Sequence, residues 1–202
     1  MNQNTIKPHA PACDRNSAPI FEVLKTHCAT AGRLLEIGSG TGQHAVYMAE
    51  RLPHVEWQTS DLPEHHAGIQ QWLDDAGLPN VFSPIALDVT ERWAPKNPFD
   101  TVFTANSLHI MSWLAVEDFF EQLPAWLAPQ GKLIAYGPFN YNGQFTSASN
   151  AQFQQWLQAR DPLSGIRDFE AVNQLALAAG CVLLDDIEMP ANNRCLVWQR
   201  NS

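Results

Sequence analysis

The sequence predicts an α/β fold: a mostly parallel sheet with helices on both faces. Two observations lead to this class. From Arg33 onward, short apolar runs alternate with segments whose apolar residues recur at helical spacing. The first apolar run is followed by a glycine-rich loop. Strands connected through helices pair in parallel, and ligands of such folds bind at the carboxyl ends of the strands.

The composition is that of one folded domain that does not bind a polyanion. The chain has 202 residues, of which 45% are hydrophobic. Asp and Glu number 21 against 12 Lys and Arg, so the formal net charge is −9. Because contacts to phosphate need Lys and Arg, this balance argues against a nucleic acid or an anionic membrane surface as partner.

The chain carries no recognisable membrane span, secretion signal or metal motif. No apolar run reaches the roughly 18 residues of a span, and the start MNQNTIKPHAPACDRN lacks the apolar core of a signal peptide. The four cysteines, at positions 13, 28, 181 and 195, show no C-x-x-C spacing. We therefore expect a cytoplasmic protein with reduced thiols and no metal.

The first half of the chain begins with a predicted arm and continues with alternating elements. Residues 1–18 are polar and contain prolines, which predicts a flexible arm or lid before a single domain over 19–202. Helical spacing predicts helices over 19–31, 45–52 and 69–76, the second ended by Pro53 and the third by Gly77. Apolar or alternating runs predict strands over 33–37, 55–60, 81–87 and 99–104.

The second half adds a block that the sheet does not need. A wide apolar stripe over 113–127 predicts a helix, with a kink or break at Pro124, and KLIAY predicts a fifth strand over 132–136. The block 138–167 then contains a long loop rich in Asn, Gly and Ser, and the start of a helix at Phe153. Finally, we expect a helix over 169–179 and a hairpin of strands over 181–188 and 194–198, which makes the last strand antiparallel.

The sharpest motif is EIGSGTGQH over residues 36–44, between a predicted strand and a predicted helix. Glycines permit a tight turn and a close approach to a ligand, and the helix start offers free N–H groups. A dinucleotide fingerprint is one interpretation, but its third glycine would stand at position 43, which is Gln. The spacing E-x-G-x-G-x-G instead resembles motif I of class I S-adenosylmethionine-dependent methyltransferases. That resemblance implies that the loop wraps the methionine part and the ribose, and that Glu36 positions the amino group.

Two acidic residues follow the next strands. Asp61 ends the second predicted strand, where a carboxylate can accept hydrogen bonds from both ribose hydroxyls; a helix cap is the alternative. Asp88 follows the third strand, and the resemblance implies that it meets the adenine amino group; capping a turn is the alternative. The nucleoside of the cofactor is expected to be flanked by Leu62, Leu87 and Val89.

The whole chain, over roughly residues 9–200, resembles a methyltransferase family known as domain of unknown function 938, whose eukaryotic relative is methyltransferase-like protein 26. The resemblance rests on CDRNSAPIFEVL, LEIGSGTGQHAVYMA, NSLHIMSW, GKLIAYGPFNYNGQFTSASNAQFQQWL, RDPLSGIRDFEAV and MPANNRCLVWQR. It implies a Rossmann-like class I methyltransferase fold with a seven-stranded sheet, and S-adenosylmethionine as cofactor, with S-adenosylhomocysteine as product. The expected cofactor-binding residues are Arg15, Asn16, Glu36, Gly38, Ser39, Gly40, Gly42, His44, Asp61, Leu62, Asp88, Val89 and Asn106.

Candidates for the chemistry lie after the fourth and fifth strands. His109 is the best general base by type, because its ordinary pKa is near neutral; a histidine bonded to backbone is the alternative. Asn106 and Tyr136 are further catalytic candidates. Phe139, Asn140, Tyr141, Arg167 and Arg194 are candidates for binding the substrate. The alternative for Arg167 is a salt-bridged turn in which Asp168 caps the next helix.

These features predict methyl transfer from S-adenosylmethionine to a small-molecule acceptor. The loop ANSLHIM at 105–111 lacks the [DN]-P-P-[YF] pattern that resembles enzymes methylating exocyclic amides or nucleobases, which argues against N-methylation of DNA, RNA or glutamine. A non-catalytic module that binds the cofactor and a protein partner is the alternative, and methylation of a protein is a further one. A nicotinamide-dependent oxidoreductase is disfavoured because position 43 is Gln.

Overall fold

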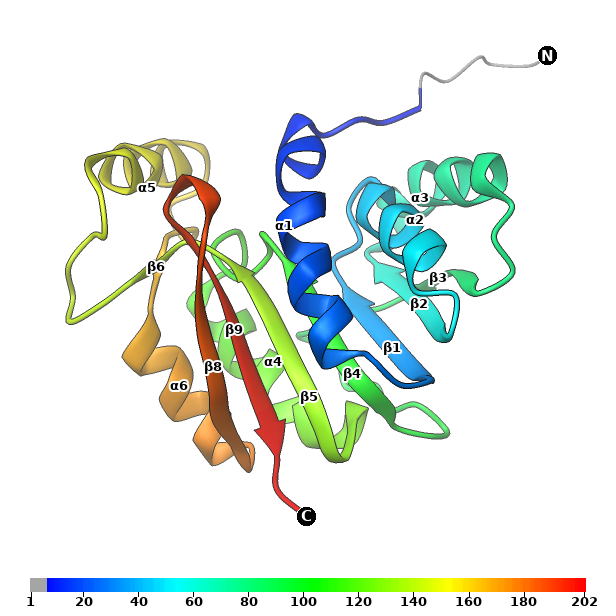
Figure 1. Cartoon of the computed structure of the whole chain (residues 1–202). Helices are drawn as coiled ribbons and strands as arrows, with labels where there is room; N and C mark the ends of the chain where they lie inside the picture. Colours follow the sequence, from blue (N-terminus) through cyan, green and yellow to red (C-terminus); the bar gives the residue numbers. More distant parts are fainter. Residues whose placement is uncertain (1–6) are drawn as a thin grey trace. The chain divides into compact units, whose positions relative to one another are not determined.

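A computed structural model describes residues 7–202 of the chain. The chain divides into two compact units, the first ending at Leu87 and the second beginning at Asp88. In Figure 1 the first unit runs from blue to cyan-green and the second from green to red. Within residues 7–202, no helix combines the length and apolar character needed to cross a membrane.

The strand order in the main sheet is β3-β2-β1-β4-β5-β9-β8. The pairs β1–β2, β2–β3 and β4–β5 are parallel, whereas β9 is antiparallel to both of its neighbours, β5 and β8. The predicted fold class, a mostly parallel seven-stranded α/β sheet whose last strand is antiparallel, is therefore confirmed.

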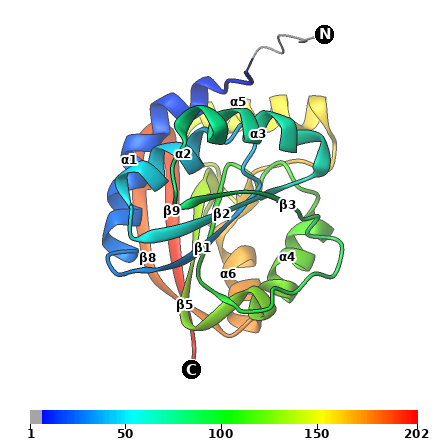
Figure 2. The ribbon, with the colours of Figure 1, turned by 90° about the vertical axis from the view of Figure 1, so that its right-hand side faces the viewer.

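The first unit alternates helices and strands as its periodicity predicts. Its elements are α1 (Pro11–His27), β1 (Gly32–Ile37), α2 (Gln43–Arg51), β2 (Val55–Asp61), α3 (Pro63–Ala76) and β3 (Val81–Ala86). Helix α2 packs against α1 and α3, and the three helices follow one another across the unit in the turned view (Figure 2). Leu34, Met48 and Trp57 are completely buried and form part of its core. Burial of such side chains is the main favourable term in folding.

Helix α1 begins earlier than the sequence predicts. It starts at Pro11 instead of residue 19, so the second half of the expected arm is helical. Proline at the first helical position loses nothing, because its missing N–H would have no partner there. Inside α1, the hydroxyl of Ser17 donates to the carbonyl of Cys13 at 2.6 Å. Residues 1–6 lie outside the described residues, and the division into an arm and a single domain stays a prediction.

The second unit holds the rest of the main sheet and a small second sheet. Its elements are β4 (Phe99–Ala105), α4 (Trp113–Trp126), β5 (Leu127–Gly137), β6 (Phe139–Asn140), α5 (Ala148–Arg160), β7 (Arg167–Asp168), α6 (Phe169–Ala178), β8 (Cys181–Met189), a 3-10 turn η1 (Pro190–Asn192) and β9 (Asn193–Arg200). Helices α4 and α6 pack together, and Phe119, Phe120 and Trp198 form an edge-to-face aromatic cluster in the core.

Several elements of this unit differ from the sequence prediction. Helix α4 is not broken at Pro124 and ends two residues later, at Trp126, where β5 follows directly and so begins five residues before the predicted strand; the kink at Pro124 stays a prediction. Helix α5 begins at Ala148, before the predicted start at Phe153. The expected loop over 137–150 contains β6, which pairs in parallel with β7. The pair is two residues long and brings together segments almost thirty residues apart, so no local pattern announces it. This pair, residues 139–140 with 167–168, holds together the two ends of the inserted block 138–167 and is called the base of the inserted block below.

Candidate functional site

The glycine loop joins β1 to α2 through backbone conformations that favour glycine. Gly38, Gly40 and Gly42 have φ values of 74°, 59° and 88°. A Cβ atom on Gly42 would lie 3.1 Å from the Cα and 3.2 Å from the carbonyl oxygen of Ile69 on α3. Gly42 therefore allows the loop to pack closely on α3. A Cβ on Gly40 would have no atom within 4 Å, so this glycine is required by its conformation alone.

The carboxylate of Glu36 is buried below this loop. Its Oε2 accepts hydrogen bonds from the hydroxyl of Ser39 at 2.9 Å and the indole N–H of Trp57 at 3.0 Å. Burial raises the pKa of the Glu36 carboxyl to about 7, although these two hydrogen bonds act in the opposite direction. A cation beside Glu36 would offset the cost of its buried charge, so the site is suited to an ammonium group.

The carboxylate of Asp61, at the end of β2, organises the same loop. Its Oδ2 accepts the backbone N–H of Gly40 at 2.7 Å, and its Oδ1 accepts that of Leu62 at 2.8 Å. Each carboxylate oxygen has two acceptor sites, so the side chain retains acceptor capacity. The cap residue of α3 is Leu62, and α3 has no side-chain capping hydrogen bond, so Asp61 is not the helix cap of the alternative interpretation. Its two hydrogen bonds fix Asp61 beside the loop, and the ribose role stays a prediction.

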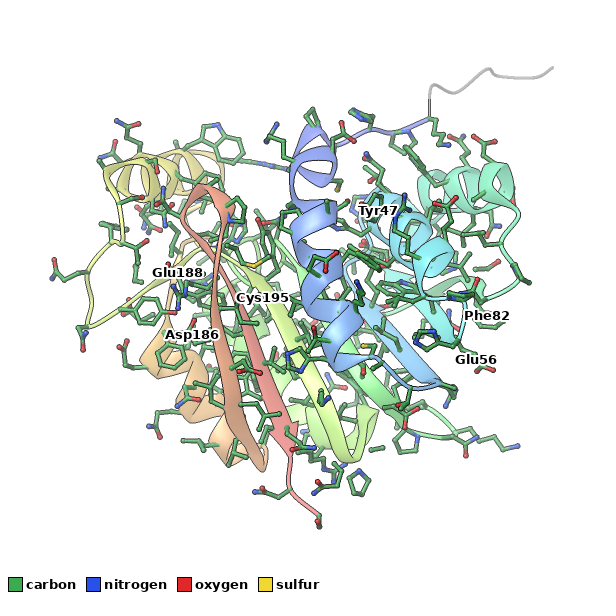
Figure 3. All side chains as sticks on the ribbon, in the orientation of Figure 1. Tyr47, Glu56, Phe82, Asp186, Glu188 and Cys195 are labelled. Carbon is green, nitrogen blue, oxygen red and sulfur yellow. The ribbon has the colours of Figure 1, made fainter. Side chains whose placement is uncertain are left out.

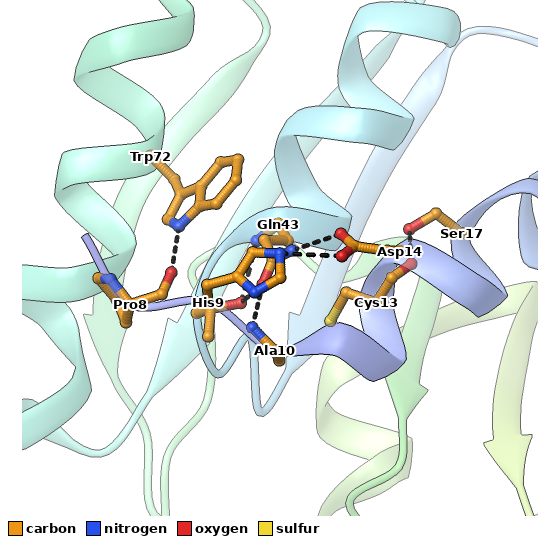
Figure 4. A network of polar contacts seen from close by, with 9 residues as sticks. Pro8, His9, Ala10, Cys13, Asp14, Ser17, Gln43 and Trp72 are labelled. Atoms are coloured by element: carbon orange, nitrogen blue, oxygen red, sulfur yellow. Dashed lines mark hydrogen bonds and ion pairs between the residues drawn. The ribbon is translucent and has the colours of Figure 1, made fainter. Parts of the chain in front are cut away.

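Residues 8–10 and the start of α1 are fastened to the helices of the first unit. Gln43, the first residue of α2, accepts the N–H of Ala10 at 2.6 Å and donates to Asp14 at 3.1 Å (Figure 4). The indole of Trp72 on α3 donates to the carbonyl of Pro8 at 2.7 Å, as the same figure shows. These contacts hold the segment next to the beginning of α2, where the cofactor is expected.

Two of the predicted cofactor-binding residues, Asn16 and His44, contact each other. The side chains of Asn16 on α1 and His44 on α2 are buried, and Asn16 Oδ1 lies 2.7 Å from His44 Nε2. Burial lowers the pKa of His44 to about 4, so the ring is neutral at physiological pH. This pair joins α1 to α2. Arg15 is exposed, and its contact with the cofactor stays a prediction.

In the second unit, Asp88 forms a tight turn with the residues that follow it. Its Oδ1 accepts both the N–H and the hydroxyl of Thr90, at 2.9 Å and 2.7 Å. The alternative of a turn capped by Asp88 is thus present in the structure. Val89 is buried, and its carbonyl accepts from Gln122 at 2.5 Å. Their contacts with adenine stay predictions.

The loop after β4 contains a strained residue and a buried histidine. Asn106 has a φ of 59°, and its N–H donates to the carbonyl of Tyr136 at 2.8 Å, which joins the ends of β4 and β5. His109 is buried, and its ring meets Phe153 edge to face. Burial lowers the pKa of His109 to about 4, and the guanidinium of Arg167 contributes in the same direction. The ring is therefore a neutral, weak base instead of one with a near-neutral pKa.

The candidate residues Tyr136, Phe139 and Asn140, in and directly after β5, are buried, whereas residues that line a substrate pocket are usually partly exposed. Tyr136 lies inside β5, paired with Cys195, and Phe139 is fully buried. Asn140 is 9% exposed, and its Oδ1 has no hydrogen-bond partner among residues 7–202. The hydroxyl of Tyr141 donates to Asp186 at 2.8 Å, and its ring stacks on Phe169.

Both arginine candidates make internal contacts. Arg167 donates to the carbonyls of Leu108 at 3.0 Å, Leu163 at 3.1 Å and Met111. It therefore holds the loop that carries His109, in place of the salt-bridged turn considered above. Arg194 binds the carboxylates of Asp186 at 2.7 Å and Glu188 at 3.2 Å, two residues labelled on β8 in Figure 3. Binding of substrate by either arginine stays a prediction.

Three residues that the sequence analysis did not assign to the site contribute to it. Gln43 anchors residues 10–14, Trp57 binds Glu36, and Asp168 stands beside Asn140. The polar residue directly after the last glycine was a usable signal for Gln43. Trp57 and Asp168 had none, because their partners lie 21 and 28 residues away. Within residues 7–202, no group of three His, Cys, Asp or Glu side chains is placed to hold a metal.

Comparison with solved structures defines the class of fold. An O-methyltransferase family protein from Burkholderia thailandensis matches with a TM-score of 0.83 and 18% identity, over 95% of this chain and 58% of that one. Human N-acetylserotonin methyltransferase, solved in complex with S-adenosylmethionine, matches with a TM-score of 0.78 and 13% identity, over 95% and 53%. A putative O-methyltransferase from Nostoc punctiforme matches with 0.77 and 18%, over 98% and 63%. The chain thus has the Rossmann-like fold of class I methyltransferases and spans between half and two thirds of these structures.

The family follows from the sequence comparison. Residues 7–200 match the family described as "Protein of unknown function (DUF938)". Since the match covers almost the whole chain, the protein belongs to this family, and the resemblance stated above is confirmed.

Proposed function

We propose that the protein transfers the methyl group of S-adenosylmethionine to a small-molecule acceptor. The observation that carries this proposal is the pair of carboxylates around the glycine loop. Buried Glu36 is suited to the cofactor's ammonium group, and Asp61, held by the N–H of Gly40, retains capacity for ribose hydroxyls. The fold supports the same cofactor, because the solved structures that share it include S-adenosylmethionine-dependent methyltransferases.

The residues of the loop fit this cofactor. The space beside Gly40 is open, with no atom within 4 Å of the position of a Cβ, so a ligand can approach the backbone there. In this proposal the cofactor's carboxylate lies at the N-terminus of α2, the positive end of the helix dipole. Asp88 and Val89 are the proposed contacts of the adenine. When bound, S-adenosylmethionine supplies an electrophilic methyl group on a sulfonium.

The chain's own residues bind and orient the acceptor. Arg167 fixes the loop 108–111 through its backbone carbonyls, and this loop carries His109. His109 is uncharged at neutral pH, and its ring accepts a hydrogen bond from the methyl acceptor. This hydrogen bond orients the methyl acceptor. The ring takes up the proton of the methyl acceptor only as the methyl group is transferred. Asn106 and Tyr136 keep the ends of β4 and β5 together at this loop.

Calorimetric titration with S-adenosylmethionine and, separately, with NAD tests the cofactor. We expect micromolar binding of S-adenosylmethionine that is lost in Asp61→Ala. The matched control is Glu56→Gln: Glu56 lies on the same strand, its side chain is 62% exposed, and it pairs loosely with Arg33 (Figure 3). This variant should bind normally. Binding of NAD without S-adenosylmethionine would overturn the proposal in favour of an oxidoreductase.

Turnover separates the enzyme from a binding module. Protein supplied with S-adenosylmethionine and a fractionated metabolite extract should release S-adenosylhomocysteine with at least one fraction. Binding without turnover, together with a stable protein partner, would support the non-catalytic alternative. Turnover only with protein fractions would support a protein methyltransferase. A cytoplasmic location is part of the same proposal.

A further inference from the structure

The buried amide of Asn140 has an acceptor that the protein leaves unused. The side chain is 9% exposed, and its Oδ1 has no hydrogen-bond partner among residues 7–202. A buried polar atom without a partner is unfavourable, and native structures contain few of them. The position is within the base of the inserted block, three residues beyond the end of β5. An unpaired acceptor there is suited to a donor on a ligand.

A carboxylate stands next to this amide. Strands β6 and β7 pair in parallel, with Asn140 opposite Asp168. Because successive side chains alternate between the two faces of a strand, the side chains of these paired residues share one face, and Phe139 and Arg167 share the other. Asp168 is half-buried and occupies the cap position of α6, yet its side chain makes no capping hydrogen bond. It therefore remains available for a ligand.

The nearby positive charges are engaged elsewhere. Arg167 donates to the carbonyls of Leu108, Met111 and Leu163, and Arg194 binds Asp186 and Glu188. The pair thus presents two acceptors, one of them anionic, on the same face. A hydroxyl group has one donor and satisfies one of them, whereas a primary or secondary ammonium group has three or two donors and a positive charge.

We propose that Asn140 and Asp168 bind a primary or secondary ammonium group, so that the methyl acceptor is an amine-bearing small molecule anchored at this pair. That this ligand is the methyl acceptor rests on the proposed function, methyl transfer. The ammonium is an anchor here, and its nitrogen need not be the atom that is methylated.

The experiment titrates the full chain with butylammonium, butanol and tetramethylammonium at neutral pH, and follows the side-chain amide signals by nuclear magnetic resonance. The Asn140 signal is assigned by its loss in Asn140→Asp. We expect butylammonium alone to shift this signal saturably. Asn140→Leu and Asp168→Asn should each weaken binding by about tenfold or more, because the first removes an acceptor and the second removes the negative charge that faces the ammonium. Asn140→Asp retains an oxygen acceptor and should bind at least as well.

Glu170→Gln is the matched control. Glu170 is exposed, two residues after Asp168, and its Oε1 accepts the N–H of Asn142 at 3.0 Å, a contact that Gln retains. This variant removes the same charge and should change affinity less than twofold. Equal effects of Asp168→Asn and Glu170→Gln, or equal binding of tetramethylammonium or butanol, would overturn the proposal. Calorimetry with S-adenosylmethionine on the same variants reports folding of the cofactor site. Intact cofactor binding without amine binding contradicts only this inference, while amine binding without cofactor binding contradicts the proposed function.

Discussion

The glycine loop of the first unit and the base of the inserted block in the second unit are built in different ways. In the loop, Glu36 and Asp61 are held by Ser39, Gly40 and Leu62, which follow β1 and β2 directly. In the block, Arg167 reaches carbonyls 59 and 56 residues earlier in the chain. The first region depends on backbone conformation at a few glycines, and the second on side chains that join distant segments. Sequence reasoning therefore succeeds more easily in the first region.

The largest effect is expected at Gly42, on which the loop's packing depends. Gly42→Ala should lower the free energy of unfolding by about 2–4 kcal/mol, because a Cβ there is strained at positive φ and lies against the backbone of Ile69. Gly40→Ala is the matched variant, with strain but without a contact, and should cost about 1–2 kcal/mol. Denaturant unfolding measures both. Equal losses would mean that close packing on α3 contributes nothing.

In the inserted block, Arg167→Met should lower stability by about 1–3 kcal/mol, because it removes the donor to three carbonyls. It should also raise the pKa of His109, since the guanidinium helps to lower it. Proton resonances of the His109 ring followed against pH measure this shift. Arg160→Met removes the same charge from α5 and should change neither quantity. An unchanged His109 pKa in Arg167→Met would show that burial alone sets it.

The pKa of Glu36 predicts how binding at the loop depends on pH. An ammonium group favours the ionised carboxylate, and with a pKa of about 7 only about one tenth of Glu36 is ionised at pH 6. The affinity for S-adenosylmethionine should therefore rise about tenfold between pH 6 and pH 8. In Glu36→Gln, binding should be weaker and should lose this dependence. A wild-type profile as flat as that of the variant would contradict the role of Glu36.

The pKa of Glu36 also predicts how the free energy of unfolding of the ligand-free protein depends on pH. The folded-state pKa of Glu36 lies above its ordinary value of 4.5, so the folded protein binds the proton more tightly than the unfolded chain. This contribution to stability is complete below about pH 4.5 and is lost as the pH rises through about 7. Glu36→Gln should remove this part of the pH dependence of unfolding, which calorimetry at several pH values would detect.

The smallest effects are expected on the β8–β9 hairpin. Asp186 and Glu188 both bind Arg194, but their side chains are 23% and 92% exposed. Asp186→Asn should cost about 1 kcal/mol, and Glu188→Gln close to nothing, because exposed ion pairs contribute little. Thermal unfolding of both variants makes the comparison. A larger loss in Glu188→Gln would contradict this ranking.

The elements of the fold were largely predictable, and the partners of the site residues were not. Strand 33–37, the glycine loop and the helix after it follow from periodicity and glycine spacing, and Gly77 ends α3 as expected, with a φ of 56°. Helix α1 begins eight residues before its predicted start, because its first residues are largely polar and show no apolar spacing, and because proline is tolerated in the first helical turn. The near-neutral pKa predicted for His109 is wrong, because neither its burial nor the position of Arg167 is visible in the sequence.

The sequence by itself determined the order of the main strands and helices along the chain and the position of the glycine loop between β1 and α2, because these depend on neighbours a few residues apart. The contact of Asp61 with Gly40 joins residues 21 positions apart and needed the tertiary structure. Only the tertiary structure decided that Arg167 and Arg194 bind the protein itself, that Glu36 is buried under Trp57, and that Asn140 meets Asp168 with an acceptor unused. Hydrogen-bond partners and burial depend on where distant segments meet, and that is fixed by packing of the whole unit.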